Sequence, residues 1–418
     1  MARNKTYTEI VTGLDIGSSA VRVVIGQLTV SKEGGNGLQI VGAVEVHSEG
    51  IQKGQITSIE DTVSAVSNAL EQAEKIVGVP IEHVWVGVSG NQIITQESKG
   101  VIAVSRTDGE IAEEDIERAV DAAKAISTPL NYEILHVLPR GFSVDGHTGI
   151  KDPVGMTGVR LEVDTKIIHS VTSHVKNLSK VVYRAGVDID DFVYLILAAG
   201  EVVTSNRQKE LGCVVVNIGG PTTSIVVYED GDVLHSAVIP IGSAHITNDL
   251  ALGLKTSIDV AERVKIEYGE CVSKSIGKKE SIDLKDLGAD TSEVVTKYYI
   301  AQIIEARVSE ILEKVDEELA SIERSSMLPA GVVFIGAGGK LNGIIDIAKQ
   351  ELSLPAQLGY PLGVDSISDK INDIAFGPAI GLVKWGSVMT GGGRRKRSLN
   401  VTRKATEKVK GILKNLIP

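Results

Sequence analysis

The sequence predicts an α/β fold in which two related lobes face each other across a cleft. Residues 12–26, TGLDIGSSAVRVVIG, read as a hydrophobic strand, a turn of small residues and a second strand. Residues 214–228, VVVNIGGPTTSIVVY, repeat this pattern, so that Asp15 aligns with Asn217 and Gly17 with Gly219. A third apolar strand, in residues 332–343, VVFIGAGGKLNG, also ends in a glycine-rich turn. The repetition indicates a chain built from two related halves.

Each of these segments places glycines directly after a buried strand, where they can serve a ligand. Glycine adopts positive φ readily and lets backbone N–H groups approach a phosphate without a Cβ in the way. One such turn is more often a plain tight turn, but three in this order make that interpretation weak. Two turns that face each other would hold a nucleotide, and the third would close the far side of the cleft.

The first lobe alternates strands with helices. Apolar residues recur on one side of residues 58–77, and Pro80 follows soon after, which predicts a helix there. The other elements expected in this lobe are a strand at 38–47, a buried strand at 84–88, a helix at 173–186, a strand at 192–197 and a helix at 198–206.

Residues 87–166 interrupt this alternation and contain no nucleotide motif. Apolar spacing predicts one strong helix at residues 113–126. Short strands are expected at 100–104, 133–138 and 159–163, with loops rich in Gly, Asp and Pro at 141–158. Such an insertion serves contacts with other proteins or stabilises its lobe, and the sequence alone leaves both readings open.

The second lobe contains predicted helices at 256–268 and 294–321, separated by a polar, lysine-containing segment at 271–290. Near the end, residues 377–382, GPAIGL, provide small residues that permit two helices to approach closely. A hinge between lobes needs such an approach.

Composition excludes several classes of protein. A chain of 418 residues is long enough for two or more domains, and 43% hydrophobic with 23% charged residues excludes disorder for most of it. Cys213 and Cys271 have no metal or redox spacing, which disfavours a disulfide framework and suits a reducing compartment. Residues 1–10 are polar and do not resemble a signal peptide, so we expect the protein in the cytoplasm.

The charge distribution sets the end of the chain apart. Residues 391–418 carry nine basic residues against one acid, a net charge of +8, so that with the whole chain at -11 the rest carries -19. An acidic body is repelled by nucleic acid and by anionic lipid, whereas this tail is attracted to them. The triglycine at 391–393 breaks the preceding helix and starts a polar linker.

Placed at helical spacing, residues 404–417 separate into an apolar and a basic side, which predicts an amphipathic helix. At about 21 Å this helix is too short and too charged to span a bilayer, but it can lie in the interface. One alternative is a helix that packs on its own domain, but the triglycine and the basic run disfavour it. The other is a nucleic-acid patch, in which the apolar side of the helix would have no use. The predicted membrane anchor consists of Val409, Ile412, Leu413, Leu416 and Ile417, with lysines on the opposite side.

The three glycine turns resemble the phosphate-1, phosphate-2 and adenosine motifs of the actin, Hsp70 and sugar-kinase superfamily. Residues 240–249, PIGSAHITND, and 261–265, AERVK, look like the cell-division protein family FtsA. This resemblance implies an actin-like fold of two duplicated RNase H-like lobes around the nucleotide cleft. The implied parts are subdomain 1A at 8–86, 167–210 and 365–390, an SHS2-like insertion (1C) at 87–166, subdomain 2A at 211–265 and 326–364, subdomain 2B at 266–325, a basic linker at 391–403 and the amphipathic helix at 404–418.

The same resemblance implies ATP and Mg²⁺ as ligands. Asp15 would hold the metal through water, and Glu262 with Lys265 would contact ribose or base, although an exposed i,i+3 ion pair is an equal alternative for these two. The expected phosphate and adenosine contacts are Gly17, Ser18, Ser19, Gly219, Gly220, Thr222, Gly336, Gly338 and Gly339.

Several cleft positions depart from the superfamily pattern. Asn217 and Ser224 stand where carboxylates are usual, and an amide holds a metal and a transition state less strongly than a full charge does. Pro221 removes an N–H donor from the second turn. Ala337 replaces a glycine, and Arg22 stands where lysine is common. We therefore expect ATP binding with weak or absent hydrolysis, and the sequence identifies no general base.

The resemblance implies a protein that polymerises on the cytoplasmic face of the membrane at the division site. There it would anchor FtsZ filaments, recruit other septal proteins and bind anionic lipid through its tail, with no nucleic-acid partner. FtsZ would dock on subdomain 2B. A pilus-assembly actin-like protein and a small-molecule kinase of the same fold are the alternatives, and the anchor and the weakened second turn disfavour the kinase.

Overall fold

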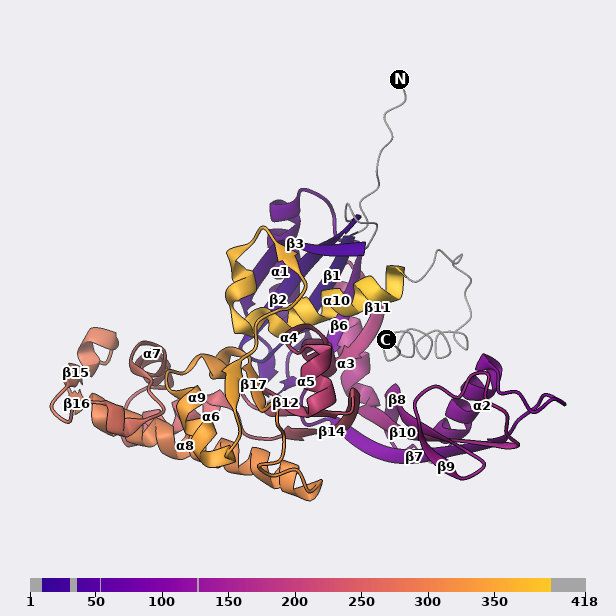
Figure 1. The fold of residues 1–418 in the computed structure, drawn as a ribbon. Helices are drawn as coiled ribbons and strands as arrows, with labels where there is room; N and C mark the ends of the chain where they lie inside the picture. Colours follow the sequence, from indigo (N-terminus) through magenta and orange to yellow (C-terminus); the bar gives the residue numbers. More distant parts are fainter. Residues whose placement is uncertain (1–9, 31–35, 53, 126–127, 392–418) are drawn as a thin grey trace.

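Two sheets with the same strand order confirm the duplication predicted from the glycine turns. The computed structural model describes residues 10–30, 36–52, 54–125 and 128–391 (Figure 1). In each lobe the first strand pairs antiparallel with its hairpin partner and parallel with a later strand. The first sheet has the order β11-β6-β1-β2-β3-β19. Read from its other end, the second sheet has the matching order β18-β17-β12-β13-β14, without a counterpart of β19.

The strands of the first sheet are β1 (Ile10–Ile16), β2 (Ala20–Val30), β3 (Asn36–His47), β6 (His83–Val88), β11 (Asp188–Tyr194) and β19 (Asp365–Ser366). Those of the second are β12 (Cys213–Ile218), β13 (Thr223–Glu229), β14 (Asp232–Ile239), β17 (Val332–Ile335) and β18 (Ala356–Leu358). A small hairpin of β4 (Ile51–Gln52) and β5 (Gln55–Ile56) follows the first three strands.

Helix α1 (Ile59–Val77) packs on the first sheet and matches the predicted range. Its first turn is fixed because the Ser58 hydroxyl accepts a hydrogen bond from the Asp61 N–H. It ends at Gly78, whose φ of 73° is a left-handed conformation that glycine adopts without strain. Helices α3 (Thr172–Arg184) and α5 (Asn206–Leu211) complete this lobe with α4 (Leu195–Val203) and α10 (Gly377–Gly391).

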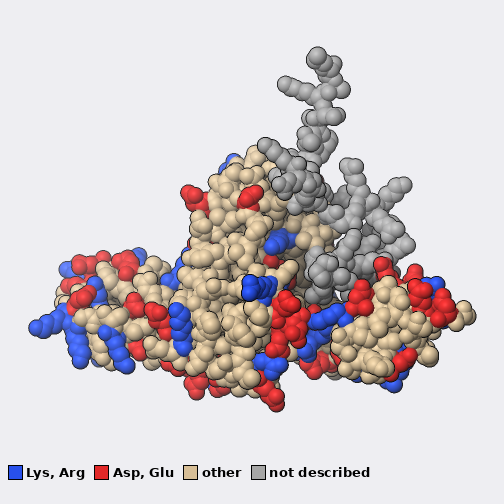
Figure 2. Space-filling view, viewed as in Figure 1, with Lys and Arg blue, Asp and Glu red and all other residues tan. Residues whose placement is uncertain are grey.

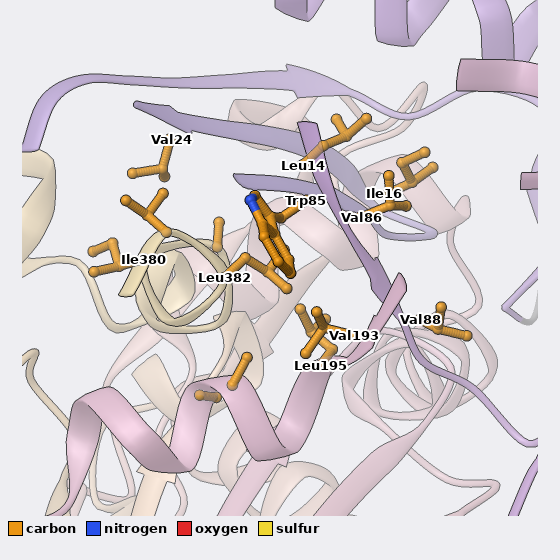
Figure 3. Close-up of a cluster of buried hydrophobic side chains, with 14 of the residues drawn as sticks. Leu14, Ile16, Val24, Trp85, Val86, Val88, Val193, Leu195, Ile380 and Leu382 are labelled. Carbon is orange, nitrogen blue, oxygen red and sulfur yellow. The ribbon is translucent and has the colours of Figure 1, made fainter. Parts of the chain in front are cut away.

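The close helix approach predicted for residues 377–382 is present. Helix α10 packs against α4, and a Cβ on Gly381 would lie only 2.2 Å from the Ala198 carbonyl oxygen. Figure 3 shows the indole of Trp85 between the strands of the first sheet and Ile380 and Leu382 of α10. The glycine therefore lets α10 press onto α4 while its apolar side chains fill the core of the first lobe.

The insertion forms a sheet of its own, in the order β7-β10-β8-β9, with helix α2 on one face (Figure 1). Its elements are β7 (Ile93–Ala103), α2 (Glu113–Lys124), β8 (Tyr132–Val144), β9 (His147–Ile150) and β10 (Arg160–Val171). The strands are longer than predicted because β10 pairs with β7 and β8 along its whole length. Ile116, Phe142 and Leu161 belong to its separate core.

The second lobe carries helices α6 (Ser243–Gly253), α7 (Ile258–Tyr268), α8 (Lys297–Ser321) and α9 (Ile344–Leu352), and the short pair β15 (Ser281–Asp283) and β16 (Val294–Thr296). Short 3₁₀ turns complete the described part of the fold: Ser273–Ser275, Leu284–Leu287, Ala337–Lys340, Asp369–Asn372 and Ile374–Phe376. Figure 2 shows both signs of charge intermingled on the arm that contains β15 and β16.

Further predicted boundaries are wrong, and the helix expected at 198–206 ends at Val203, before the separate helix α5. The helix expected from residue 294 begins at Lys297, because Val294–Thr296 pairs as β16 with β15 and the Thr296 hydroxyl caps α8. The strand expected at 192–197 ends at Tyr194, where its parallel pairing with β6 ends, and Leu195 starts α4. Helix α6 was not predicted.

Strand β14 connects the second lobe to the first lobe and to the insertion. The Ser236 hydroxyl donates to the Tyr194 hydroxyl at 3.0 Å, and the Thr95 hydroxyl donates to the Ser236 carbonyl at 3.3 Å. The Lys151 ammonium donates to the Asp230 carbonyl at 2.9 Å and pairs with the Asp232 carboxylate. These contacts join segments of the chain that are distant in sequence.

The predicted basic linker and amphipathic anchor lie almost entirely outside the described residues, with only Gly391 of the linker inside them. Within the residues that the structure describes, no helix combines the length and apolar character needed to cross a bilayer.

Candidate nucleotide site

The two predicted phosphate turns face each other and close in the same way. The Gly17 N–H donates to the Ala20 carbonyl at 3.1 Å, and the Gly219 N–H donates to the Thr222 carbonyl at 2.9 Å. A Cβ on Gly220 would lie 2.7 Å from the Ser19 hydroxyl oxygen of the opposite lobe. The turns therefore meet across the cleft, and a side chain at 220 would require the Ser19 hydroxyl to move.

One cavity collects most of the predicted site residues from both lobes. The predicted residues that line it are Asp15, Gly17, Ser18, Ser19, Gly219, Gly220, Thr222 and Gly336. Glu262, Lys265, Gly338 and Gly339 are not among the described residues that line this cavity. The roles of all these residues in ligand binding stay predictions.

Asp15 lies at the end of β1, where its carboxylate is buried in the cavity wall. Burial raises its pKa to about 6, although the Arg22 cation opposes this rise and the Glu45 anion adds to it. Within the described part of the chain, the carboxylate makes no hydrogen bond or ion pair. A buried carboxylate without a partner fits a hard cation that keeps most of its water ligands, such as Mg²⁺.

Asn217 occupies the matching place at the end of β12 and also lines the cavity. Its side-chain oxygen lies close to the third turn, since a Cβ on Gly336 would come within 2.3 Å of it. Gly336 has a φ of 84°, so both its conformation and its neighbour require glycine. An amide oxygen at 217 is a neutral ligand and adds no charge to that of Asp15.

Arg22 lines the cavity but is held at its side. Its Nε donates to a Glu45 carboxylate oxygen at 2.7 Å, and its guanidinium lies 5.8 Å from the centre of the Phe376 ring. These contacts neutralise the cation locally and fix its position.

The second turn rests on the start of helix α6. The Ser243 N–H donates to the Gly219 carbonyl at 2.8 Å, and the Ala244 N–H donates to the Gly220 carbonyl at 2.8 Å. These helical N–H groups have no partner inside the helix, so the turn satisfies them. The start of α6 therefore holds the second turn through two backbone hydrogen bonds.

Glu262 and Lys265 form a network directly behind this turn. The Lys265 ammonium donates to Glu262 at 2.7 Å, to the Thr247 hydroxyl at 2.9 Å and to the Ser243 carbonyl at 3.4 Å. This is the i,i+3 ion pair considered from the sequence, with the Lys265 side chain buried and the Glu262 side chain 43% exposed. It joins α7 to the end of α6 that supports the second turn.

In the third segment, Gly336 and Ala337 line the cavity, whereas Gly338 and Gly339 are buried. A Cβ on Gly338 would lie 2.4 Å from the Ile218 side chain, so this glycine allows the Ala337–Lys340 turn to pack on β12.

The cavity also contains residues that sequence analysis missed. Gly54, Ser89, Gly90 and His174 line it from the first lobe. The Gly54 N–H donates to the Ser18 hydroxyl oxygen at 2.9 Å, so the β4–β5 hairpin holds the first turn. No local pattern marks these residues, because only the folded arrangement of the first lobe brings them to the cleft. Within the described residues, no group of three or more His, Cys, Asp and Glu has the arrangement of a metal cluster.

Solved structures confirm the class of fold. A chain of the PilM-PilN type IV pilus biogenesis complex superimposes with a TM-score of 0.65 at 16% identity, covering 90% of this chain and 98% of that one. MreB5 of Spiroplasma citri bound to ADP gives a TM-score of 0.53 at 13% identity, covering 92% of this chain and 99% of that one. At such identities the likeness concerns the fold alone. The repeated sheets and facing turns therefore define an actin-like class of fold.

Sequence relatives define the family. The family model described as the SHS2 domain inserted in FtsA matches residues 90–169, and the model of cell division protein FtsA matches residues 214–381. FtsA of Pseudomonas aeruginosa is 33% identical over 378 residues, 90% of this chain and 89% of that relative. FtsA of Bacillus subtilis is 37% identical over 377 residues, which cover 90% of this chain and 83% of that relative. The chain belongs to the FtsA family of actin-like cell division proteins, as the resemblance predicted, and the distant pilus protein does not favour the pilus alternative.

Proposed function

We propose that this protein binds ATP between its two lobes and anchors FtsZ filaments to the cytoplasmic face of the cell membrane at the division site. The observation that carries the proposal is the contact of two glycine turns across one cavity, in a chain that belongs to the FtsA family. An adenine nucleotide in this cavity would have its phosphates between the turn at Gly17 and the turn at Gly219.

Mg²⁺ would be held through water by Asp15, with the neutral Asn217 opposite. The metal would neutralise phosphate charge when bound. Gly17, Ser18, Ser19, Gly220 and Thr222 would supply N–H and hydroxyl groups to the phosphates. Gly336 would back the adenosine, whereas Gly338, Gly339, Glu262 and Lys265 would support the site from behind. Because Asn217 lacks a charge, hydrolysis would be slow.

Attachment to the membrane would come from the tail. Five aliphatic side chains, each half-buried among lipids, would contribute about 1 kcal/mol each to membrane binding. Each basic residue near an anionic surface would add up to about 1 kcal/mol, before the cost of ordering the helix. One copy would bind reversibly. Self-association into filaments would present many tails in a row, and avidity would make attachment much tighter. The predicted subdomain boundaries, FtsZ docking on subdomain 2B and recruitment of other septal proteins belong to the same proposal.

Co-sedimentation with anionic vesicles tests the anchor. We expect the full chain with ATP to pellet with the vesicles and to bring FtsZ with it, whereas deletion of residues 391–418 leaves both proteins in the supernatant. A variant with Leu413→Asp and Leu416→Asp keeps the basic residues but loses the apolar arc, and it should also stay soluble. A matched Lys255→Gln variant, on the body, should pellet like the full chain. Unchanged lipid binding after the deletion would contradict the anchor.

A further inference from the structure

The first turn of helix α3 brings an ionisable side chain to the cleft that the proposed site does not yet use. His174 and Leu178 are one helical turn apart, so they share a face of α3, and both line the cavity with Leu195. Val175, Val181 and Val182 of the same helix are buried in the lobe, which fixes the rotation of the helix and directs this face to the cavity.

From the connections of α3 we infer that His174 lies on the phosphate side of the cleft. Helix α3 packs against β5, and Gly54, directly before β5, donates its N–H to the Ser18 hydroxyl of the first turn. Helix α3 therefore contacts the same short hairpin that holds the first phosphate turn.

The His174 ring is available for a ligand, whereas the Arg22 guanidinium, which also lines the cavity, is already paired. Arg22 is paired with Glu45. Within the described part of the chain, the His174 imidazole makes no hydrogen bond or ion pair. A polyphosphate that enters the cavity would find in this ring a donor without a competing partner.

We propose that His174 is a further phosphate-binding residue of the cleft and contacts the terminal phosphate of ATP as an imidazolium. The proposal rests on the proposed ATP binding and adds proton uptake to it. A charge-assisted hydrogen bond to phosphate is stronger than a neutral one, so the ligand stabilises the protonated ring.

The electrostatics of the empty cleft make this protonation dependent on the ligand. Burial lowers the pKa of His174, so the ring is neutral near pH 7 when no anion is present. Asp15, whose pKa burial raises to about 6, is the other group of the cavity that titrates near neutral pH. Phosphate anions raise the pKa of the ring, and binding therefore takes up a proton between the two pKa values of His174.

Charged groups on the elements that pack against α3 do not line the cavity. Helix α1 contributes Glu60, which pairs with Arg184 at the other end of α3 at 2.7 Å. Strand β10 contributes His169, whose pKa is also lowered by burial, and β5 contributes no charged residue. Strand β11 contributes the acidic residues Asp188, Asp190 and Asp191. Burial is the one cause of the lowered pKa of His174.

Calorimetry of ATP binding in two buffers of different ionisation enthalpy tests the proposal. At pH 7 with Mg²⁺, we expect the full-length protein to take up a fraction of a proton per ATP more than His174→Gln does. Affinity of His174→Gln for ATP should fall about tenfold at pH 6.5 and much less at pH 8.5, because the advantage of the histidine is lost as pH rises through its pKa in the complex. Contributions from Asp15 and from the nucleotide are common to both proteins and cancel in the comparison.

Two further variants separate charge from structure. His174→Arg carries a fixed charge, so it should keep ATP affinity at pH 8.5 and show no extra proton uptake. His147→Gln, exposed on the insertion, should behave like the unaltered protein. Equal affinity and equal proton uptake in the unaltered protein and His174→Gln would overturn this inference alone. Absence of ATP binding by the unaltered protein would overturn the proposed function as well.

Discussion

At the scale of single residues, equivalent strand ends in the two halves of the cleft differ in one carboxylate. Asp15 and Asn217 end equivalent strands, and the turns that follow them close with the same hydrogen bond. The geometry of a two-carboxylate site is therefore present with only one carboxylate. Such a site can hold a nucleotide while it stabilises the transition state of hydrolysis poorly.

Restoring the charge at 217 tests this interpretation. Asn217→Asp should raise phosphate release from ATP by about tenfold or more, because a full charge strengthens the hold on the metal and on the transition state. Nucleotide affinity should stay roughly similar. Steady-state phosphate release and nucleotide titration measure the two effects, with Asn206→Asp, exposed on α5, as the matched control. Equal turnover in the altered and unaltered proteins would show that Asn217 does not limit hydrolysis.

Asp15 predicts a dependence of stability on pH. Burial raises its pKa from 3.8 to about 6, so the empty folded protein carries a poorly solvated charge above pH 6, and this cost disappears as pH falls toward 4. Asp15→Asn should therefore raise the free energy of unfolding at pH 8 by up to about 3 kcal/mol more than at pH 4. Urea unfolding without nucleotide or Mg²⁺ measures this difference.

The exposed residue Asp188 provides the control for that experiment, since Asp188→Asn should have a similar effect at both pH values. The Mg²⁺-dependent part of ATP affinity should be lost in Asp15→Asn only. Destabilisation of Asp15→Asn at pH 8 would mean that the carboxylate has a stabilising partner in the empty protein.

At the scale of elements, the close contact between α4 and α10 depends on Gly381, which has no side chain. A Cβ on Gly381 would lie 2.2 Å from a backbone oxygen of α4, and backbone cannot move aside as a flexible side chain can. Gly381→Ala should therefore lower the free energy of unfolding by about 1–3 kcal/mol, the usual cost of overpacking.

Gly377→Ala, in the same helix, is the matched control. A Cβ there would meet its nearest atom at an ordinary 3.6 Å, so this change should be neutral or slightly stabilising because it restricts the unfolded chain. Thermal unfolding of both variants measures the contrast. Similar losses in the two proteins would indicate general sensitivity of α10 rather than a close contact at 381.

Elements with a strong local pattern were predictable from the sequence. Helix α1 matched its range because apolar spacing and the Ser58 cap agree, and the glycine turns were found because strand and turn residues are adjacent in sequence. The start of α4 was wrong because the apolar run from Phe192 suits a strand and a buried helix equally, and the end of pairing with β6 decides between them.

At the scale of the whole molecule, the sequence indicated the duplicated lobes but not how other segments complete the site. His174, Gly54 and Ser89 reach the cavity from three separate parts of the first lobe, and no spacing in the sequence links them. The same holds for Lys265, whose burial depends on the packing of α7 against α6. Long-range placement of this kind comes from the sheet order, which local patterns do not contain.

Strand β14 links the strand that follows the second turn to the insertion. It is the neighbour of β13, which follows the second turn, and its hairpin receives the hydrogen bonds of Thr95 and Lys151 from the insertion. The insertion is therefore tied by direct hydrogen bonds to the strand beside the one that leaves the second turn, so the rim of the molecule and its centre share one continuous framework.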